Sequence, residues 1–360
     1  MSGRKVTLLL SVLMVAILLT AVAAPGARAA RSPSLTSELR VMTRNLYFGT
    51  NPIPAVITNC DSFVDAATAA YQAALATDFP ARAAAIAAEI AVARPHLVGI
   101  QEGTVWSEQW PEGQTTDFVQ MILDALSGRG ENYSVLASAP GFKIVFPTHD
   151  GDVELRVGNY LLVRSNEETV TFANVQTGNY EARLSFPTCL GWIELPRQWV
   201  SVDATFGPRT VHVVNTHLEA ALRSVRVNQA NELLSGPAQS EWPALLIGDF
   251  NAEPGVDDDA AAILMDGGFE DVWALANSMG AGLTCCQEAD LRNEESLLSS
   301  RIDLLLMRGH LPVGSIRRMG AEPLIPLPAS GVRWASDHAG VAATFGGPLH
   351  TIFLPLSPAN

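Results

Sequence analysis

Short apolar segments that end in polar residues constrain the fold of this chain more than any other feature of its sequence. Residues 39–43, 96–100 and 244–247 have the alternating or fully apolar pattern of strands. Ala-rich stretches with helical character lie between the first two strands, over residues 62–76 and 80–93. Strands interspersed with helices are typical of layered α/β packing, so we expect sheets that are covered by helices.

The same alternation continues almost to the end of the chain. Further strands are expected over residues 133–138, 158–163, 168–175, 199–206, 210–215, 302–307 and 340–345, and further helices over residues 117–126, 220–234 and 259–266. Asp78 is placed to cap the helix at 80–93, and Pro80 suits its first turn. No repeat of fixed period interrupts the pattern, which predicts one α/β domain over residues 39–346.

The first 29 residues have the pattern of a secretory signal peptide. Arg4 and Lys5 precede an apolar run over residues 6–24, and Ala27-Arg28-Ala29 offers the small residues of a cleavage site. The run is also long enough for a membrane anchor, but the Pro25-Gly26 break favours cleavage and secretion. We therefore expect a signal peptide at 1–29, a disordered lead-in at 30–38, the domain at 39–346 and a C-terminal tail at 347–360.

The charge of the chain weakens a nucleic-acid function without excluding it. The sequence carries 37 acidic and 23 basic side chains, for a net charge of −14 with neutral histidines. An acidic surface repels nucleic-acid phosphates and offers no broad basic stripe. A few local cations and a bound metal can still attract a phosphoester to an acidic protein.

Four cysteines in an exported chain suggest disulfides. Cys285 and Cys286 are adjacent, and a ring between neighbours is strained, so each is expected to pair elsewhere. Cys60 and Cys189 are then their partners, in an order that the sequence leaves open. The alternative is two buried free thiols and one accidental bridge.

The polar residues at or just beyond the strand ends all come from the set asparagine, aspartate, glutamate and histidine. They are Asn45, Glu102, Asn215, His217, Asp249, Asn251, Asp303, Asp337 and His338. Side chains at strand ends are positioned to point into a shared cleft, so we expect these residues to meet. Taken singly, each has an ordinary alternative: a surface acid at Glu102, an Asx turn at Asp249 and Asn251, or a structural histidine.

Six of these segments together resemble the ordered motifs of one known family. They read Met42-Thr43-Arg44-Asn45, Val98-Gly99-Ile100-Gln101-Glu102, Asn215-Thr216-His217-Leu218-Glu219, Gly248-Asp249-Phe250-Asn251, Arg301-Ile302-Asp303 and Ser336-Asp337-His338. In this order they resemble the endonuclease/exonuclease/phosphatase superfamily, and the chain looks like a secreted, bacterial-type member. The resemblance implies a four-layer α/β sandwich, with two mostly antiparallel sheets face to face, helices outside and an active site at one sheet edge.

Two differences from the motifs of one subfamily indicate which members of the family the chain resembles most. Abasic-site endonucleases of the family carry Asn-x-Asp at the first motif, whereas this chain has Asn45-Leu46-Tyr47, and they generally lack the Thr216-His217 pair. Both features are more similar to pancreatic-type deoxyribonucleases, neutral sphingomyelinases and inositol-phosphate phosphatases. In that group the Gly158-Asn159 strand recurs, so Asn159 and Asn215 are expected to bind substrate.

The chemistry of phosphoester hydrolysis requires a cation, because an anionic phosphodiester repels hydroxide. Carboxylate and amide oxygens suit Mg²⁺, with Mn²⁺ or Ca²⁺ as alternatives. We expect Glu102 to bind the metal directly, with Asn45 beside it and Asp337 as a further ligand.

The remaining strand-end residues are expected to act on the reacting groups. The resemblance implies that Asp249 orients or deprotonates the attacking water and that Asn251 donates to a phosphate oxygen. His217 and His338 can donate to a phosphoryl oxygen or protonate the leaving oxygen, and Asp303 can hold and charge His338. Glu154 is a weak candidate for the acid that orients His217.

The sequence therefore predicts a secreted, metal-dependent hydrolase of phosphoester bonds, and the alternative is a catalytically silent binding or adhesive exoprotein on the same fold. The expected partner is a nucleic acid, phospholipid or inositol phosphate substrate, without an obligate protein partner, for a monomer. Trp106 and Trp110 follow Glu102 and can either dip into a membrane interface or pack locally.

Overall fold

A computed structural model describes residues 38–51, 60–276 and 280–346. The chain divides into two units, Met1–Ser34 and Leu35–Asn360. The first unit lies outside the described residues, and so do the predicted signal peptide, all but the last residue of the predicted lead-in, and the C-terminal tail. Within the described ranges, no helix is both long and apolar enough to cross a membrane.

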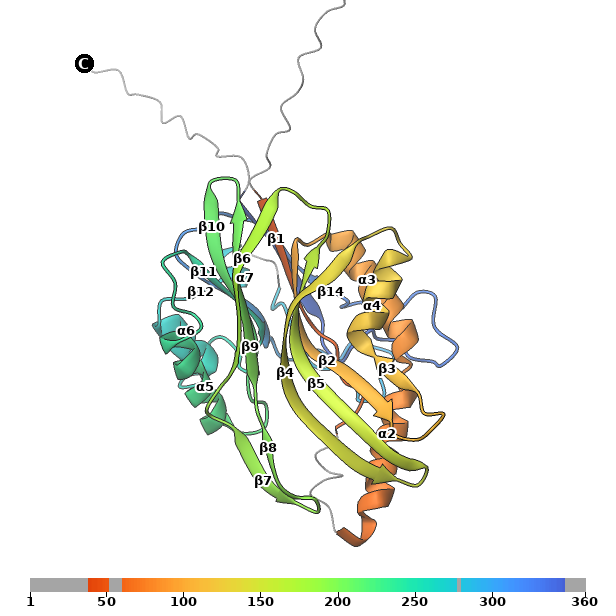
Figure 1. Ribbon diagram of the computed structural model, residues 1–360. Coiled ribbons are helices and arrows are strands. Elements are labelled where there is room, and N and C mark those ends of the chain that lie inside the picture. The colour runs from red at the N-terminus through yellow and green to blue at the C-terminus, as the bar shows by residue number, and fades with distance from the viewer. Residues whose placement is uncertain (1–37, 52–59, 277–279, 347–360) are drawn as a thin grey trace, which may run out of the picture. The chain divides into compact units, whose positions relative to one another are not determined.

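Two large sheets form the centre of the second unit, side by side in Figure 1. The seven-stranded sheet contains, in spatial order, β14 (Val313–Met319), β15 (Gly340–Gly346), β1 (Glu38–Asn45), β2 (Leu97–Glu108), β5 (Gly151–Arg164) and β4 (Tyr133–Thr148), with β3 (Thr115–Asp117) paired to β2. The six-stranded sheet contains β12 (Glu270–Asp271), β13 (Asp303–Arg308), β11 (Ala244–Asp249), β10 (Arg209–His217), β9 (Gln198–Phe206) and β6 (Val170–Asn179). Only the pairs β1–β2 and β10–β11 are parallel among the described strands, so both sheets are mostly antiparallel.

Helices cover the outer face of each sheet. On the seven-stranded side lie α2 (Phe63–Ala76), α3 (Phe79–Ala93) and α4 (Phe118–Ser127), and on the other side lie α5 (Arg223–Ser235) and α6 (Ala260–Asp266). The short α7 (Val272–Leu275) contributes Val272 to the apolar cluster between the sheets. Separate apolar clusters fill the spaces beneath α2–α4, between the sheets, and beneath α5 and α6. The expected four-layer α/β sandwich is confirmed.

Local sequence explains several of these elements. The Asp78 side chain accepts a hydrogen bond from the Ala81 N–H and so caps α3, as predicted. Every residue of β11 is buried, because sheets and helices cover it on both sides, and this accounts for its uninterrupted apolar run. The predicted helices at 62–76 and 80–93 are confirmed to within one residue at each end.

A third, two-stranded ribbon lies outside the two sheets. It consists of β7 (Leu184–Thr188) and β8 (Gly191–Leu195), and a disulfide joins Cys189 in its turn to Cys60, just before α2. Cys285 is bonded to Cys286. The predicted pairing of the 285–286 couple with Cys60 and Cys189 is therefore wrong, because the fold brings together two cysteines 129 residues apart in sequence.

Candidate active site

The registers of three neighbouring strands place their polar ends at one level of the six-stranded sheet. His217 on β10 lies beside Asp249 on β11, and Asp249 lies beside Asp303 on β13. Gly248 permits this close approach: its φ is +145°, and a Cβ there would stand 1.9 Å from the Thr216 carbonyl oxygen. The sequence therefore needs glycine immediately before Asp249.

Side chains from the other sheet reach across to this cluster. The Asn45 amide on β1 donates to the Asp249 Oδ2 atom over 3.0 Å. Gln101 on β2 donates to the Asn215 Oδ1 atom over 2.6 Å, and the Asn215 amide donates to the carbonyl groups of Ile100 and Tyr160. These hydrogen bonds fix the two sheets relative to each other at the edge where their polar strand ends meet.

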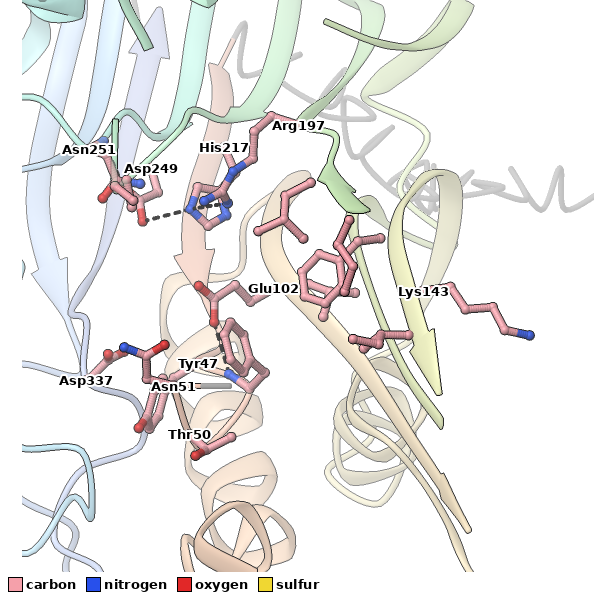
Figure 2. A pocket seen from close by; sticks show the side chains of 18 of the residues that line it. Tyr47, Thr50, Asn51, Glu102, Lys143, Arg197, His217, Asp249, Asn251 and Asp337 are labelled. Atoms are coloured by element: carbon pink, nitrogen blue, oxygen red, sulfur yellow. Dashed lines mark hydrogen bonds and ion pairs between the residues drawn. The ribbon is translucent and has the colours of Figure 1, made fainter. Parts of the chain in front are cut away.

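The polar residues of both sheets open into one cavity of about 680 Å³. Its polar lining includes Tyr47, Glu102, Lys143, Arg197, His217, Asp249, Asn251, Asp337 and His338. Figure 2 shows Asp249, Asn251 and His217 at one end of this cavity, Lys143 at the other and Glu102 between them. The predicted convergence of strand-end residues is present in the structure.

His338 is paired with a buried carboxylate. Its Nδ1 atom lies 2.8 Å from the Asp303 Oδ2 atom, and both side chains are almost completely buried. Burial lowers the pKa of His338, but the charges of Asp303, Asp337 and Asp249 outweigh it and hold the pKa well above its ordinary value. These aspartates therefore favour the protonated form of His338, which can donate a proton.

His217, in contrast to His338, is uncharged. Burial and then the charge of Arg197 lower the pKa of His217 to about 3, so the ring is neutral at neutral pH. The Arg197 guanidinium donates to its Nε2 atom over 3.0 Å, and Glu219 holds the same guanidinium at 3.1 Å. Glu154, the weak candidate for orienting His217, pairs instead with Lys143 and Arg156, so that hypothesis is wrong.

Backbone geometry turns Glu102 into the cavity. The pairing of β2 with β5 shifts between Ile100 and Gly103, and Glu102 adopts a left-handed φ of +55° at this bulge. Its carboxylate accepts hydrogen bonds from the Phe48 N–H and the Asn45 amide. Tyr47 and Asn251 also line the cavity with positive φ, so three cavity residues have left-handed backbone.

Two acids that line the cavity have too little positive charge nearby to offset the cost of burying their own negative charges. Burial, and then the charge of Asp337, raise the pKa of Glu102 to about 7. The pKa of Asp337 is also raised, chiefly by burial. A divalent cation between these partly buried carboxylates removes this penalty, and carboxylate oxygens are the donors that Mg²⁺ prefers. The donor set of Glu102 and Asp337 therefore fits the predicted metal.

Two other groups of candidate ligands are less suitable. Asp249, Asp303 and His338 lie close enough to share an ion, but His338 already uses its Nδ1 atom on Asp303. Cys285 and Cys286 lie near His338, but their sulfurs are bonded to each other. Asn45, expected beside Glu102 at the metal, does not line the cavity. Its Oδ1 atom accepts from the Tyr47 N–H, and its amide donates to Asp249 and Glu102, so its side chain positions these two carboxylates.

A family model described as the endonuclease/exonuclease/phosphatase family matches residues 57–338. The chain belongs to this family. The family hydrolyses phosphoester bonds, and the fold and the ordered motifs identified in the sequence agree with this membership. No match was found among curated protein sequences.

Solved structures show the same endonuclease/exonuclease/phosphatase fold. A family member from Leptotrichia buccalis has a TM-score of 0.54 at 13% identity and covers 85% of this chain and 99% of its own. A mannosyl-6-phosphatase from Bacteroides thetaiotaomicron has a TM-score of 0.52 at 18% identity, covering 85% and 98%. Humanized TDP2 of D. rerio has a TM-score of 0.51 at 17% identity, covering 86% and 100%. At these identities the likeness concerns the fold alone.

Two residues that we expected to contact the substrate of this family member lie elsewhere. Asn215 is fully buried and uses its side chain to join the two sheets. Asn159 is buried as well, and its amide donates to the Gln198 carbonyl over 2.9 Å. Neither residue lines the cavity, so both support its walls.

Beside His217 the structure places a basic residue, Arg197, and it places one of the two tryptophans in the interior. Arg197 lines the cavity beside His217, but it lies before β9, where the pattern of polar strand ends does not single it out. Trp106 is buried, donates to the Phe48 carbonyl and packs edge-on against Phe146, so of the two alternatives for this residue the structure shows local packing. Trp110 is partly buried against the same apolar cluster.

Proposed function

We propose that this chain is a secreted phosphoester hydrolase that uses Mg²⁺, with Mn²⁺ or Ca²⁺ as alternatives, and a water molecule as nucleophile. The observation that carries the proposal is the convergence, in one cavity, of a charged histidine, a neutral histidine and three carboxylates from both sheets. The carboxylates are Glu102, Asp249 and Asp337. A purely structural site has no need for so many buried charges.

In this proposal Glu102 and Asp337 hold the cation. When bound, the metal neutralises the phosphate charge and lowers the pKa of water. Asp249 accepts hydrogen bonds from the Asn45 amide and the Asn251 N–H, so its carboxylate is held in place to orient or deprotonate the attacking water.

The opposite states of the two histidines support different roles. His338, charged through Asp303, is a donor for a phosphoryl oxygen or for the leaving oxygen. His217 is neutral and accepts a hydrogen bond from Arg197, so it positions that guanidinium beside the reacting phosphate. Asn251 lines the cavity and offers a further donor to phosphate oxygens.

An activity survey with one purified sample tests this proposal. With Mg²⁺ present we expect turnover of DNA, sphingomyelin or a phosphoinositide, and Asp249→Asn should abolish it. A folded protein that hydrolyses none of these and no simple diester such as bis(4-nitrophenyl) phosphate would support a silent binding or adhesive protein instead.

Secretion is tested with the same gene. Expression with the native N-terminus should yield protein in the medium that begins near residue 30. Retention of the full chain in the membrane fraction would contradict this part of the proposal.

A further inference from the structure

The wall of the cavity that faces away from the catalytic residues is apolar. It is formed by side chains of β4, β5 and the β7–β8 ribbon, chiefly Phe142, Ile144, Val157, Phe186, Ile193 and Leu195. These side chains are only partly buried, so part of their apolar surface remains open to the cavity. A volume of about 680 Å³ with apolar walls and a few convergent polar groups is typical of a site for an organic ligand.

The ribbon presents one of its two faces to the cavity. Phe186 on β7 is directly paired with Ile193 on β8, and both line the cavity. Successive residues of a strand point to opposite faces, and Trp192, next to Ile193, is 74% exposed and outside the lining. The disulfide between Cys60 and Cys189 anchors the turn of this ribbon to the segment before α2.

The charges in the cavity do not suit a polynucleotide. Among the described residues that line it, the basic side chains other than histidine are Lys143 and Arg197. Lys143 pairs with Glu154 at 2.6 Å, and Arg197 pairs with Glu219 at 3.1 Å. A nucleic-acid strand needs unpaired cations along its phosphates, and this wall offers apolar side chains in their place.

We infer that the site takes a phosphoester whose organic group is an apolar chain or ring, with that group lying on the wall formed by β4, β5 and the ribbon. This inference rests on the proposed function, because it places the phosphate at Asp249, His217 and His338. Burial of the organic group against apolar side chains provides the binding preference. Aliphatic and aromatic esters share this chemistry.

Alkylphosphonates test the inference, because each carries one organic group and no ester bond to be hydrolysed. Methyl-, butyl-, hexyl- and phenylphosphonate are compared as competitive inhibitors of bis(4-nitrophenyl) phosphate hydrolysis, with 3-hydroxypropylphosphonate as the polar match for butylphosphonate. We expect the inhibition constant to fall by roughly tenfold or more from methyl to hexyl. The hydroxyl compound should bind more weakly than its butyl match. Tighter binding of hexylphosphonate points to an aliphatic ester, and tighter binding of phenylphosphonate points to an aromatic one.

The two faces of the ribbon supply matched variants. Ile193→Ala, or Phe186→Ala as a second choice, should reduce the ratio between the methyl and hexyl inhibition constants by about threefold or more. Trp192→Ala changes a larger side chain on the opposite face and should leave the ratio unchanged.

Equal inhibition constants across the series would overturn the inference, and so would a Trp192→Ala effect as large as that of Ile193→Ala. Absence of hydrolysis of this diester and of every substrate in the activity survey would count against the proposed function. In that case calorimetry of the same phosphonates still measures whether the cavity prefers apolar organic groups. A failure of the inference can therefore be distinguished from a failure of the proposed function.

Discussion

His338 and Asp303 form the most closely joined acid–base pair of the site, with 2.8 Å between their nearest atoms. The chain offers a natural control for them. His212 and Asp203, on β10 and β9, form a second buried pair at 2.6 Å that does not line the cavity. Comparison of the two pairs separates catalysis from structural support.

We predict that His338→Ala lowers kcat by ~10²–10⁴-fold, the usual range for a positioned acid or base, while metal binding is largely kept. Asp303→Asn should also lower kcat, because an amide neither charges the imidazole nor fixes its tautomer. Steady-state kinetics on the best substrate provide the measurement. His212→Ala and Asp203→Asn should change the melting temperature and leave kcat nearly unaltered. A kcat for His338→Ala within about threefold of wild type would show that this histidine has no acid–base role.

Single residues of the site could be predicted where they end an apolar strand. His217, Asp249 and Asp303 follow this rule, because the strand places them and the sheet register then brings them together. Arg197 is different: it reaches the cavity from the start of β9 and is fixed by Glu219 and His217, contacts that depend on tertiary structure. Asn159 and Asn215 look like site residues in the sequence, but their hydrogen bonds are with carbonyl groups and a neighbouring amide of the protein itself.

At the scale of elements, the β7–β8 ribbon is anchored by a disulfide. It lies outside both large sheets, and Cys189 in its turn is bonded to Cys60 across 129 residues of sequence. We predict that Cys60→Ser with Cys189→Ser lowers the free energy of unfolding by ~2–5 kcal/mol, because the unfolded chain regains the freedom of a long loop. Urea unfolding of both proteins measures this difference.

Peptide mapping without reduction checks the pairing itself. A cross-linked peptide that contains Cys60 and Cys189 is expected. A link from either residue to Cys285 or Cys286 would contradict the structure.

The start of β2 holds a histidine that should make folding pH-dependent. His96 is buried, its Nδ1 atom accepts from the Arg40 N–H, and the Arg40 guanidinium lies 2.9 Å from Nε2. Burial, and then the charge of Arg40, lower the pKa of His96 to about 4. The unfolded chain therefore binds a proton between about pH 6.5 and pH 4 that the folded protein does not. The stability contributed by neutral His96 is present above pH 6.5 and is lost as the pH falls toward 4.

His96→Gln should remove this contribution. We expect the free energy of unfolding of wild type to fall more steeply with acid than that of the variant, by up to ~1.4 kcal/mol per pH unit in this window. Urea unfolding at several pH values measures both slopes. His310→Gln, at an exposed position, should keep the wild-type slope. Parallel slopes for wild type and His96→Gln would show that His96 is not the responsible group.

Elements could be predicted from the sequence where one periodic pattern governs a whole segment. The helices α2 and α3 and the strand β11 are of this kind. β4 is longer than expected because it passes through Pro140 and a register shift without ending. The ribbon was missed because Pro187 interrupts its alternation, and β14 was missed because its exposed arginines hide the pattern of an edge strand.

At the scale of the whole molecule, each sheet supplies half of the site. Glu102 comes from the seven-stranded sheet, Asp249 and His217 come from the six-stranded sheet, and the loop before β15 supplies Asp337 and His338. The four-layer arrangement could be predicted because the ordered motifs resemble those of a known family, and each motif lies at or near one end of a strand. The shape of the cavity could not, because it depends on how the ribbon and β4 pack around the sheet edge.

The central claim is that partly buried acids of this cavity bind a divalent cation that phosphoester hydrolysis requires. The most direct measurement is hydrolysis of bis(4-nitrophenyl) phosphate as Mg²⁺ is added back to metal-free protein, for wild type and for Glu102→Gln. Glu108→Gln, on the same strand, is the control, because Glu108 binds Tyr71 and the Gln114 N–H outside the cavity. We predict no activity in excess EDTA, full recovery with Mg²⁺ in wild type and Glu108→Gln, and a loss of about 100-fold or more in Glu102→Gln at an unchanged melting temperature. Full activity in excess EDTA, or wild-type turnover in Glu102→Gln, would contradict the account.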